Sequence, residues 1–202
     1  MAKTQFPPAI RSRPVYGVWE PRAGSAHLMV ADAAGAGSIS DLVARDPALL
    51  ARMHVIYITG KDAAARANAL AALAPAQFYR SPTYAAALPR LRKVLADAHM
   101  GLQVYLAGTE GLIGQAQNEA MAAGIPYTAI QTEHRGSLAR RVQCVHCKGI
   151  TEDVRTDPIQ CSHCGLNLFV RDNYSRRIAA FQGVNIDAED PGVVPNPEER
   201  FP

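Results

Sequence analysis

The chain has 202 residues, of which 48% are hydrophobic and 19% charged, and its formal net charge is +3. This is the composition of a globular protein, and no apolar run approaches the roughly 20 residues of a membrane-spanning helix. The small positive net charge does not indicate a nucleic-acid partner. Because the first 26 residues lack the apolar stretch of a secretory signal, we expect a cytoplasmic protein with neither a membrane nor a nucleic-acid partner.

From residue 27 to residue 131, short apolar runs alternate with alanine-rich segments of helical period, which is the rhythm of βαβ units. The expected strands are His27–Asp32, His54–Thr59, Ala76–Tyr79, Leu102–Leu106 and Tyr127–Gln131. The expected helices are Ser40–Met53, interrupted at Pro47, then Lys61–Ala74, Pro89–His99 and Leu112–Ala123. The pattern predicts an α/β fold with a five-stranded, doubly wound parallel sheet.

The composition also predicts where the domains begin and end. Residues 1–26 are proline-rich and are expected to be extended, and residues 27–138 form the α/β domain. Residues 139–184 contain all four cysteines and form a small metal ribbon. Residues 185–202 carry four prolines and five acidic residues, so we expect an extended tail that only a partner would order.

The four cysteines form two CxxC knuckles separated by 13 residues, which is the pattern of one tetrahedral thiolate site. Each knuckle is followed by a glycine, Gly149 or Gly165, that allows a tight turn. His146 and His163 lie inside the knuckles, but four thiolates already fill a tetrahedron. The predicted metal ligands are Cys144, Cys147, Cys161 and Cys164.

Structural zinc is the first choice for this site, because binding a redox-silent ion would supply folding energy to a hairpin too small to be stable alone. Rubredoxin-like iron uses the same ligands and is the alternative, although rubredoxin loops are as a rule longer. A thioredoxin-type redox pair would leave the second knuckle unexplained.

Two loops after expected strands could bind a nucleotide, since ligands of open α/β sheets lie beyond the carboxyl ends of the strands. Gly35 and Gly37 follow the first strand, where a plain turn is the competing interpretation. Gly108 and Thr109 follow the fourth strand, in a turn that resembles the last βα turn of the nicotinamide-binding domain of ferredoxin reductases. The Cys-Gly-Pro motif of those reductases is Ala107-Gly108-Thr109 here, so the resemblance implies the fold and little nicotinamide chemistry.

The segment Val142–Val184 resembles the C-terminal module of the DmmA-like small subunit of bacterial dimethylamine monooxygenase. The resemblance is most specific in the cysteine ribbon and in Arg171–Arg177, which follows it. The resemblance extends over the whole chain, including the Tyr-Leu-Ala-Gly-Thr-Glu-Gly turn that begins at Tyr105. It implies a holoenzyme that uses NADPH and dioxygen to convert dimethylamine to methylamine and formaldehyde. Haem, FMN and an iron–sulfur cluster would then lie on larger partner subunits of a hetero-oligomer.

Neither a catalytic triad nor a phosphate-binding Walker loop occurs in the sequence, so we predict no catalytic residue in this chain. An accessory subunit for assembly or electron transfer is the leading hypothesis, with a stand-alone NAD(P)H reductase and a rubredoxin-like electron carrier as alternatives. Aromatic and arginine residues after Cys164, among them Phe169, Tyr174 and Phe181, favour either a partner interface or packing within the chain.

Overall fold

The computed structural model describes residues 12–60 and 64–202, and the chain divides into two compact units. The first unit is Tyr16–Ala139, and the second combines Arg140–Pro202 with residues 12–15 of the described chain. Within the described ranges, no helix combines the length and apolarity needed to cross a membrane. Lys61, the expected first residue of a helix, lies outside the described residues.

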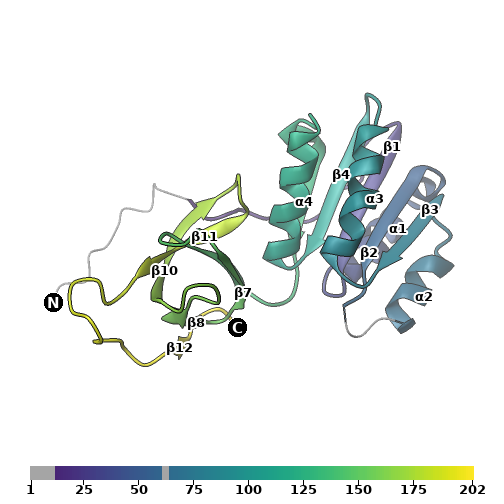
Figure 1. The fold of residues 1–202 in the computed structure, drawn as a ribbon. Coiled ribbons are helices and arrows are strands. Elements are labelled where there is room, and N and C mark those ends of the chain that lie inside the picture. The colour runs from purple at the N-terminus through teal and green to yellow at the C-terminus, as the bar shows by residue number, and fades with distance from the viewer. Residues whose placement is uncertain (1–11, 61–63) are drawn as a thin grey trace. The chain divides into compact units, whose positions relative to one another are not determined.

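The α/β unit contains one parallel sheet in the order β3-β2-β1-β4-β5. Its strands are β1 (Ala26–Asp32), β2 (Met53–Ile58), β3 (Gln77–Ser81), β4 (Leu102–Gly108) and β5 (Ile130–His134). Its helices are α1 (Ala36–Arg45), α2 (Ala64–Ala72), α3 (Tyr84–Ala96) and α4 (Glu110–Ala122), with 3₁₀ turns η1 (Pro47–Arg52) and η2 (Tyr127–Ala129). The expected doubly wound sheet is thereby confirmed (Figure 1).

Alternate residues of each strand supply two separate apolar cores, one on each face of the sheet. Met29 and Tyr105 face α1 and α2, together with the fully buried Trp19. Val30 and Leu106 face α3 and α4. Because both faces are covered, the central strands are mainly apolar, as is usual in a buried parallel sheet.

Several element boundaries differ from the sequence-based expectations, for local reasons. Helix α1 ends before Pro47, and Asp46 caps the following 3₁₀ turn by accepting a hydrogen bond from Ala48 N at 3.1 Å. Helix α3 begins five residues before the expected Pro89, because the Thr83 hydroxyl oxygen accepts a hydrogen bond from Ala86 N and caps the helix. The fifth strand begins at Ile130 rather than Tyr127.

The segment before β1 was expected to be extended and to lie outside the α/β domain. In the structure, residues from Tyr16 onward belong to the α/β unit. Gly17 N donates a hydrogen bond to Thr132 O at 2.9 Å, and the Trp19 indole nitrogen donates to Leu106 O at 3.2 Å. Trp19 has no exposed surface. Burial of this large aromatic side chain holds the segment on the sheet.

The second unit is built around a mixed sheet in the order β7-β6-β11-β10-β9. Its strands are β6 (Arg140–Cys144), β7 (Ile150–Val154), β9 (Ile159–Gln160), β10 (Asn167–Ser175) and β11 (Ala180–Asn185). A second, two-stranded ladder pairs β8 (Thr156–Asp157) with β12 (Glu198–Glu199). The ribbon therefore includes strands that come after the cysteines as well as those between them.

The end of the chain contradicts the expected extended tail. Phe201 is 6% exposed and joins the core of the second unit with Val142, Val154 and Phe181. Arg200 forms an ion pair of 2.7 Å with the buried carboxylate of Asp157. The charge and proline content of the tail concealed this apolar residue, which holds the terminus on the ribbon together with the Arg200–Asp157 ion pair and the β8–β12 ladder.

Candidate metal centre and nucleotide loops

Two turns bring the four cysteine side chains together. Cys144 is the last residue of β6 and Cys147 follows in the next turn, while Cys161 and Cys164 lie between β9 and β10. The Sγ atoms of Cys144 and Cys164 are 3.8 Å apart, those of Cys147 and Cys161 are 3.7 Å apart, and all four lie within 4.8 Å of one another. Four sulfurs each about 2.3 Å from one ion at tetrahedral angles would be about 3.8 Å apart, so the spacing fits a tetrahedral thiolate site.

The two knuckles have the same backbone geometry. Lys148 N donates to Cys144 O, and Gly165 N donates to Cys161 O, both at 3.0 Å. The donors have positive φ values, 64° at Lys148 and 77° at Gly165. The left-handed position of the first knuckle is thus occupied by Lys148 and not by the expected Gly149.

Gly149 serves a different purpose, because a Cβ atom there would collide with the imidazole of His163. That ring lies against the first knuckle, with His163 Nε2 3.0 Å from Ile150 O. Gly149 N also donates to Cys147 Sγ at 3.4 Å. His163 therefore covers the site from outside the set of four sulfurs, and the small glycine makes room for it.

The pKa values of Cys161 and Cys164 are shifted in opposite directions. Burial raises the pKa of Cys161, but the N–H groups of Cys164 and His163 outweigh it and lower that pKa to about 6. At Cys164 the N–H of Leu166 lowers the pKa, yet burial and the neighbouring thiols raise it to about 12. One thiolate thus makes ionisation of the next unfavourable, and a divalent cation would remove this conflict.

The donor set fits a soft, thiolate-binding metal ion. Cys144 and Cys161 are buried, whereas Cys147 and Cys164 are more exposed, so the site sits at the edge of the ribbon. Leu168 packs on the two buried cysteines. Zinc and iron both suit four thiolates at these distances.

The expected nucleotide loops are brought together, but around a side chain of the protein itself. Asp32, the last residue of β1, accepts hydrogen bonds at Oδ1 from Ala34 N at 3.0 Å and Gly35 N at 3.1 Å. Its Oδ2 accepts from Thr109 N at 2.9 Å and from the Thr109 hydroxyl at 2.7 Å. Gly37 lies apart from this cluster, in the first turn of α1. Three of the four expected residues, Gly35, Gly108 and Thr109, therefore surround Asp32, which the sequence reasoning did not single out.

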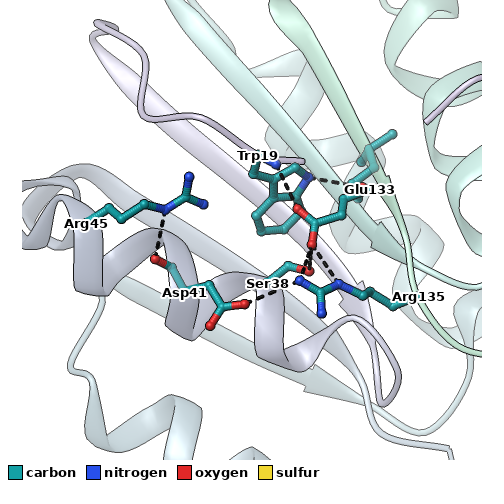
Figure 2. A network of polar contacts seen from close by, with 7 residues as sticks. Trp19, Ser38, Asp41, Arg45, Glu133 and Arg135 are labelled. Carbon is teal, nitrogen blue, oxygen red and sulfur yellow. Dashed lines mark hydrogen bonds and ion pairs between the residues drawn. The ribbon is translucent and has the colours of Figure 1, made fainter. Parts of the chain in front are cut away.

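A buried carboxylate, Glu133, links the segment before β1, helix α1 and the end of β5 (Figure 2). Its Oε2 accepts from Trp19 N at 2.7 Å, and its Oε1 accepts from the Ser38 hydroxyl at 2.8 Å and from Arg135 Nε at 2.7 Å. The Arg135 guanidinium also pairs with Asp41 of α1 at 3.3 Å. Burial raises the pKa of Glu133, but these donors outweigh it, and the net pKa is lowered.

Family models match both units of the chain. The model described as dimethylamine monooxygenase subunit DmmA-like, N-terminal domain, matches residues 8–130, and the model of the C-terminal domain matches residues 141–184. The chain belongs to the DmmA-like family. The first match covers most of the expected α/β domain, and the second includes all four cysteines.

A curated relative from Ectopseudomonas mendocina (strain ymp) is the delta subunit of a heme-dependent oxidative N-demethylase. It is 35% identical over 107 residues, which are 52% of this DmmA-like chain and 61% of the relative. The match thus covers less than two thirds of that relative.

Two solved structures align with parts of this chain at low sequence identity. A type IV self-sufficient cytochrome P450 monooxygenase aligns over 81% of this chain and 21% of its own, at 18% identity and a TM-score of 0.48. Phthalate dioxygenase reductase aligns over 68% of this chain and 46% of its own, at 13% identity and a TM-score of 0.45.

Proposed function

We propose that this DmmA-like chain is a metal-containing accessory subunit of a multisubunit dimethylamine monooxygenase. The holoenzyme would use NADPH and dioxygen to convert dimethylamine to methylamine and formaldehyde. The observation that carries the proposal is the family match across both units, 8–130 and 141–184. The curated relative, a subunit of an oxidative N-demethylase, supports the same class of complex.

Zinc is the metal we propose for Cys144, Cys147, Cys161 and Cys164. When bound there it would supply a cross-link between two knuckles and no redox chemistry. The chain itself holds the sulfurs at tetrahedral spacing. Gly149 N donates a hydrogen bond to Cys147 Sγ, and His163 covers the site. A site of this kind would stabilise the fold of the ribbon.

Haem, FMN and an iron–sulfur cluster would belong to partner subunits, and the assembly would be a cytoplasmic hetero-oligomer. The placement of the nucleotide-dependent chemistry on partner subunits is supported by the described residues of the α/β unit. There, the two loops that could receive a nucleotide are held together by Asp32. We therefore propose assembly or electron transfer between partners as the role of this chain.

Co-expression with candidate haem-bearing and flavin-bearing subunits tests the proposal. We expect this chain to co-purify with them, and NADPH-dependent formaldehyde release from dimethylamine to require it. The Cys144→Ser variant should weaken assembly, whereas His163→Ala, which keeps four thiolates, should assemble normally. Full activity of the partners without this chain would contradict the proposal.

A rubredoxin-like iron site is the alternative that the geometry also accommodates, because thiolate spacing and N–H···S bonds suit either ion. Elemental analysis and an absorption spectrum separate the two. Colourless protein with one zinc per chain supports the structural site. Red protein with one iron per chain would make the ribbon an electron carrier.

A stand-alone NAD(P)H reductase is the remaining alternative, and it requires an open nucleotide site in the α/β unit. Calorimetry with NADPH and the purified chain addresses it. We expect no measurable binding, and micromolar affinity would favour the reductase.

A further inference from the structure

The sheet of the α/β unit has one topological switch point, between β1 and β4. From β1 the order runs through β2 to β3 on one side, and through β4 to β5 on the other. The loops that leave β1 and β4 therefore diverge, and in open α/β sheets a ligand enters at this divergence. Backbone N–H groups at the starts of α1 and α4 would there face a phosphate.

In this chain, N–H groups of these two loops already donate hydrogen bonds to a carboxylate. Asp32 reaches from β1 across the switch point and accepts two hydrogen bonds from the β1–α1 loop and two from Thr109, 77 residues later. We infer that Asp32 is a built-in anionic ligand of the switch point, which takes the place of a nucleotide phosphate and closes the α/β unit to dinucleotides. The inference is independent of the proposed membership in a monooxygenase.

The loops approach each other so closely that the carboxylate fills the space between them. A Cβ atom at Gly35 would collide with the carbonyl of Ala107, and one at Gly108 would collide with the Asp32 carboxylate. Gly108 also has a φ of 131°, which glycine adopts most readily. The two glycines thus permit the two loops to meet around Asp32.

The segment after β5 closes the same place from the side. Arg135 N donates to Gly108 O at 2.8 Å, and a Cβ atom at Gly136 would lie 2.7 Å from Ala34 Cβ. Arg135 is in turn fixed by Glu133 and Asp41 (Figure 2). A phosphate would have to displace Asp32 and would meet its negative charge, since the protein donors are already satisfied.

Removal of the carboxylate should convert this point into a binding site for an external anion. Asp32→Ala leaves the N–H groups of Ala34 and Thr109 and the Thr109 hydroxyl without this acceptor, whereas Gly35 N still donates to the backbone carbonyl of residue 32. We expect the melting temperature of this variant to fall by roughly 5 °C or more. Sodium pyrophosphate, compared with sodium chloride at equal ionic strength, should restore at least half of that loss with saturation. Wild-type protein should show no such response.

Asp46→Ala is the matched control, because it removes a capping carboxylate at the opposite end of α1. Pyrophosphate should not raise its melting temperature. An equal rise in Asp46→Ala or in the wild type, or no rise in Asp32→Ala, would overturn the inference.

A second measurement applies to the wild-type chain even if Asp32→Ala does not fold. Pyrophosphate is titrated while the amide resonances of Ala34, Gly35 and Thr109 are followed by NMR. We expect no saturable shift at these three amides. A saturable shift at them would show that the switch point accepts an external phosphate, and the inference would fail.

Discussion

At the scale of single residues, two buried charged side chains, Glu133 and Arg140, connect parts of the chain that are distant in sequence. Glu133 is 3% exposed and accepts hydrogen bonds from Trp19 N, Ser38 and Arg135. Arg140 is 6% exposed and lies 4.0 Å from the ring centres of both Phe181 and Phe201. Each buried charge is therefore matched by partners that replace water.

The lowered pKa of Glu133 makes stability of the α/β unit depend on pH. A carboxylate with a depressed folded-state pKa stabilises the fold above its unfolded value, ordinarily 4.5, and this contribution is lost as the pH falls through the folded-state pKa. We expect Glu133→Gln to lower the free energy of unfolding near neutral pH by about 2–3 kcal/mol. Its stability should then change less than that of the wild type on acidification.

Urea unfolding of the α/β unit at a neutral and an acidic pH measures this difference. Glu20→Gln removes the same charge from a side chain that is 69% exposed, and it serves as the control. If Glu133→Gln kept the wild-type pH dependence, the carboxylate would not be the titrating group.

Arg140 should stabilise the ribbon through the flat face of its guanidinium as well as through its charge. It forms an ion pair of 3.0 Å with Asp172 while stacking between two phenylalanine rings. Arg140→Ala should cost about 3 kcal/mol, and Arg140→Lys, which keeps the charge but not the planar stack, about half of that. Chemical denaturation of the metal-loaded protein gives both values, and equal stability of Arg140→Lys and the wild type would argue against stacking.

At the scale of elements, the short strand β12 anchors a terminus that the composition predicted to be extended. Its residues Glu198 and Glu199 are exposed, and they pair with β8 through the backbone. Phe201 then enters the core beside Val142 and Phe181. The stabilising group is thus the aromatic side chain that follows the strand.

Deletion of residues 196–202 should lower the stability of the ribbon by about 3–4 kcal/mol, since it removes a buried phenylalanine and the Arg200–Asp157 ion pair. The double variant Glu198→Ala, Glu199→Ala keeps the backbone ladder and should stay within about 0.5 kcal/mol of the wild type. Thermal unfolding distinguishes them. Equal melting temperatures for the deletion and the wild type would mean that the tail contributes nothing.

At the scale of the whole molecule, the two compact units have separate cores and only one contains the cysteines. We expect Cys144→Ser to lose the metal and unfold residues 140–202, because a structural zinc supplies about 10–16 kcal/mol to a domain of this kind. The sheet of the Tyr16–Ala139 unit should persist.

Amide hydrogen exchange combined with metal analysis checks this outcome. Exchange in Cys144→Ser should be fast throughout the ribbon and slow in β1, β2 and β4. His163→Ala removes a side chain that is not one of the four sulfur ligands, and this variant should retain one metal per chain. Protection of the ribbon in metal-free protein would show that its apolar core suffices.

The sequence by itself determined the features that depend on local spacing. The alternation of apolar runs and helical segments predicted the doubly wound sheet, since a buried strand must be apolar throughout. The two CxxC knuckles predicted the thiolate cluster, since two cysteines three positions apart can both bind one ion. The interruption expected at Pro47 is present, because α1 ends at Arg45 and a 3₁₀ turn begins at Pro47.

Only the tertiary structure decided what depends on distant partners. Asp32 and Thr109 are 77 residues apart, and nothing in either loop indicates that a carboxylate would fill the space expected for a phosphate. Likewise, Trp19 meets Glu133 and Phe201 meets Arg140 through contacts between segments that are distant in sequence. Local patterns record which residues prefer burial, but the identity of the group that satisfies a buried charge is settled by packing across the fold.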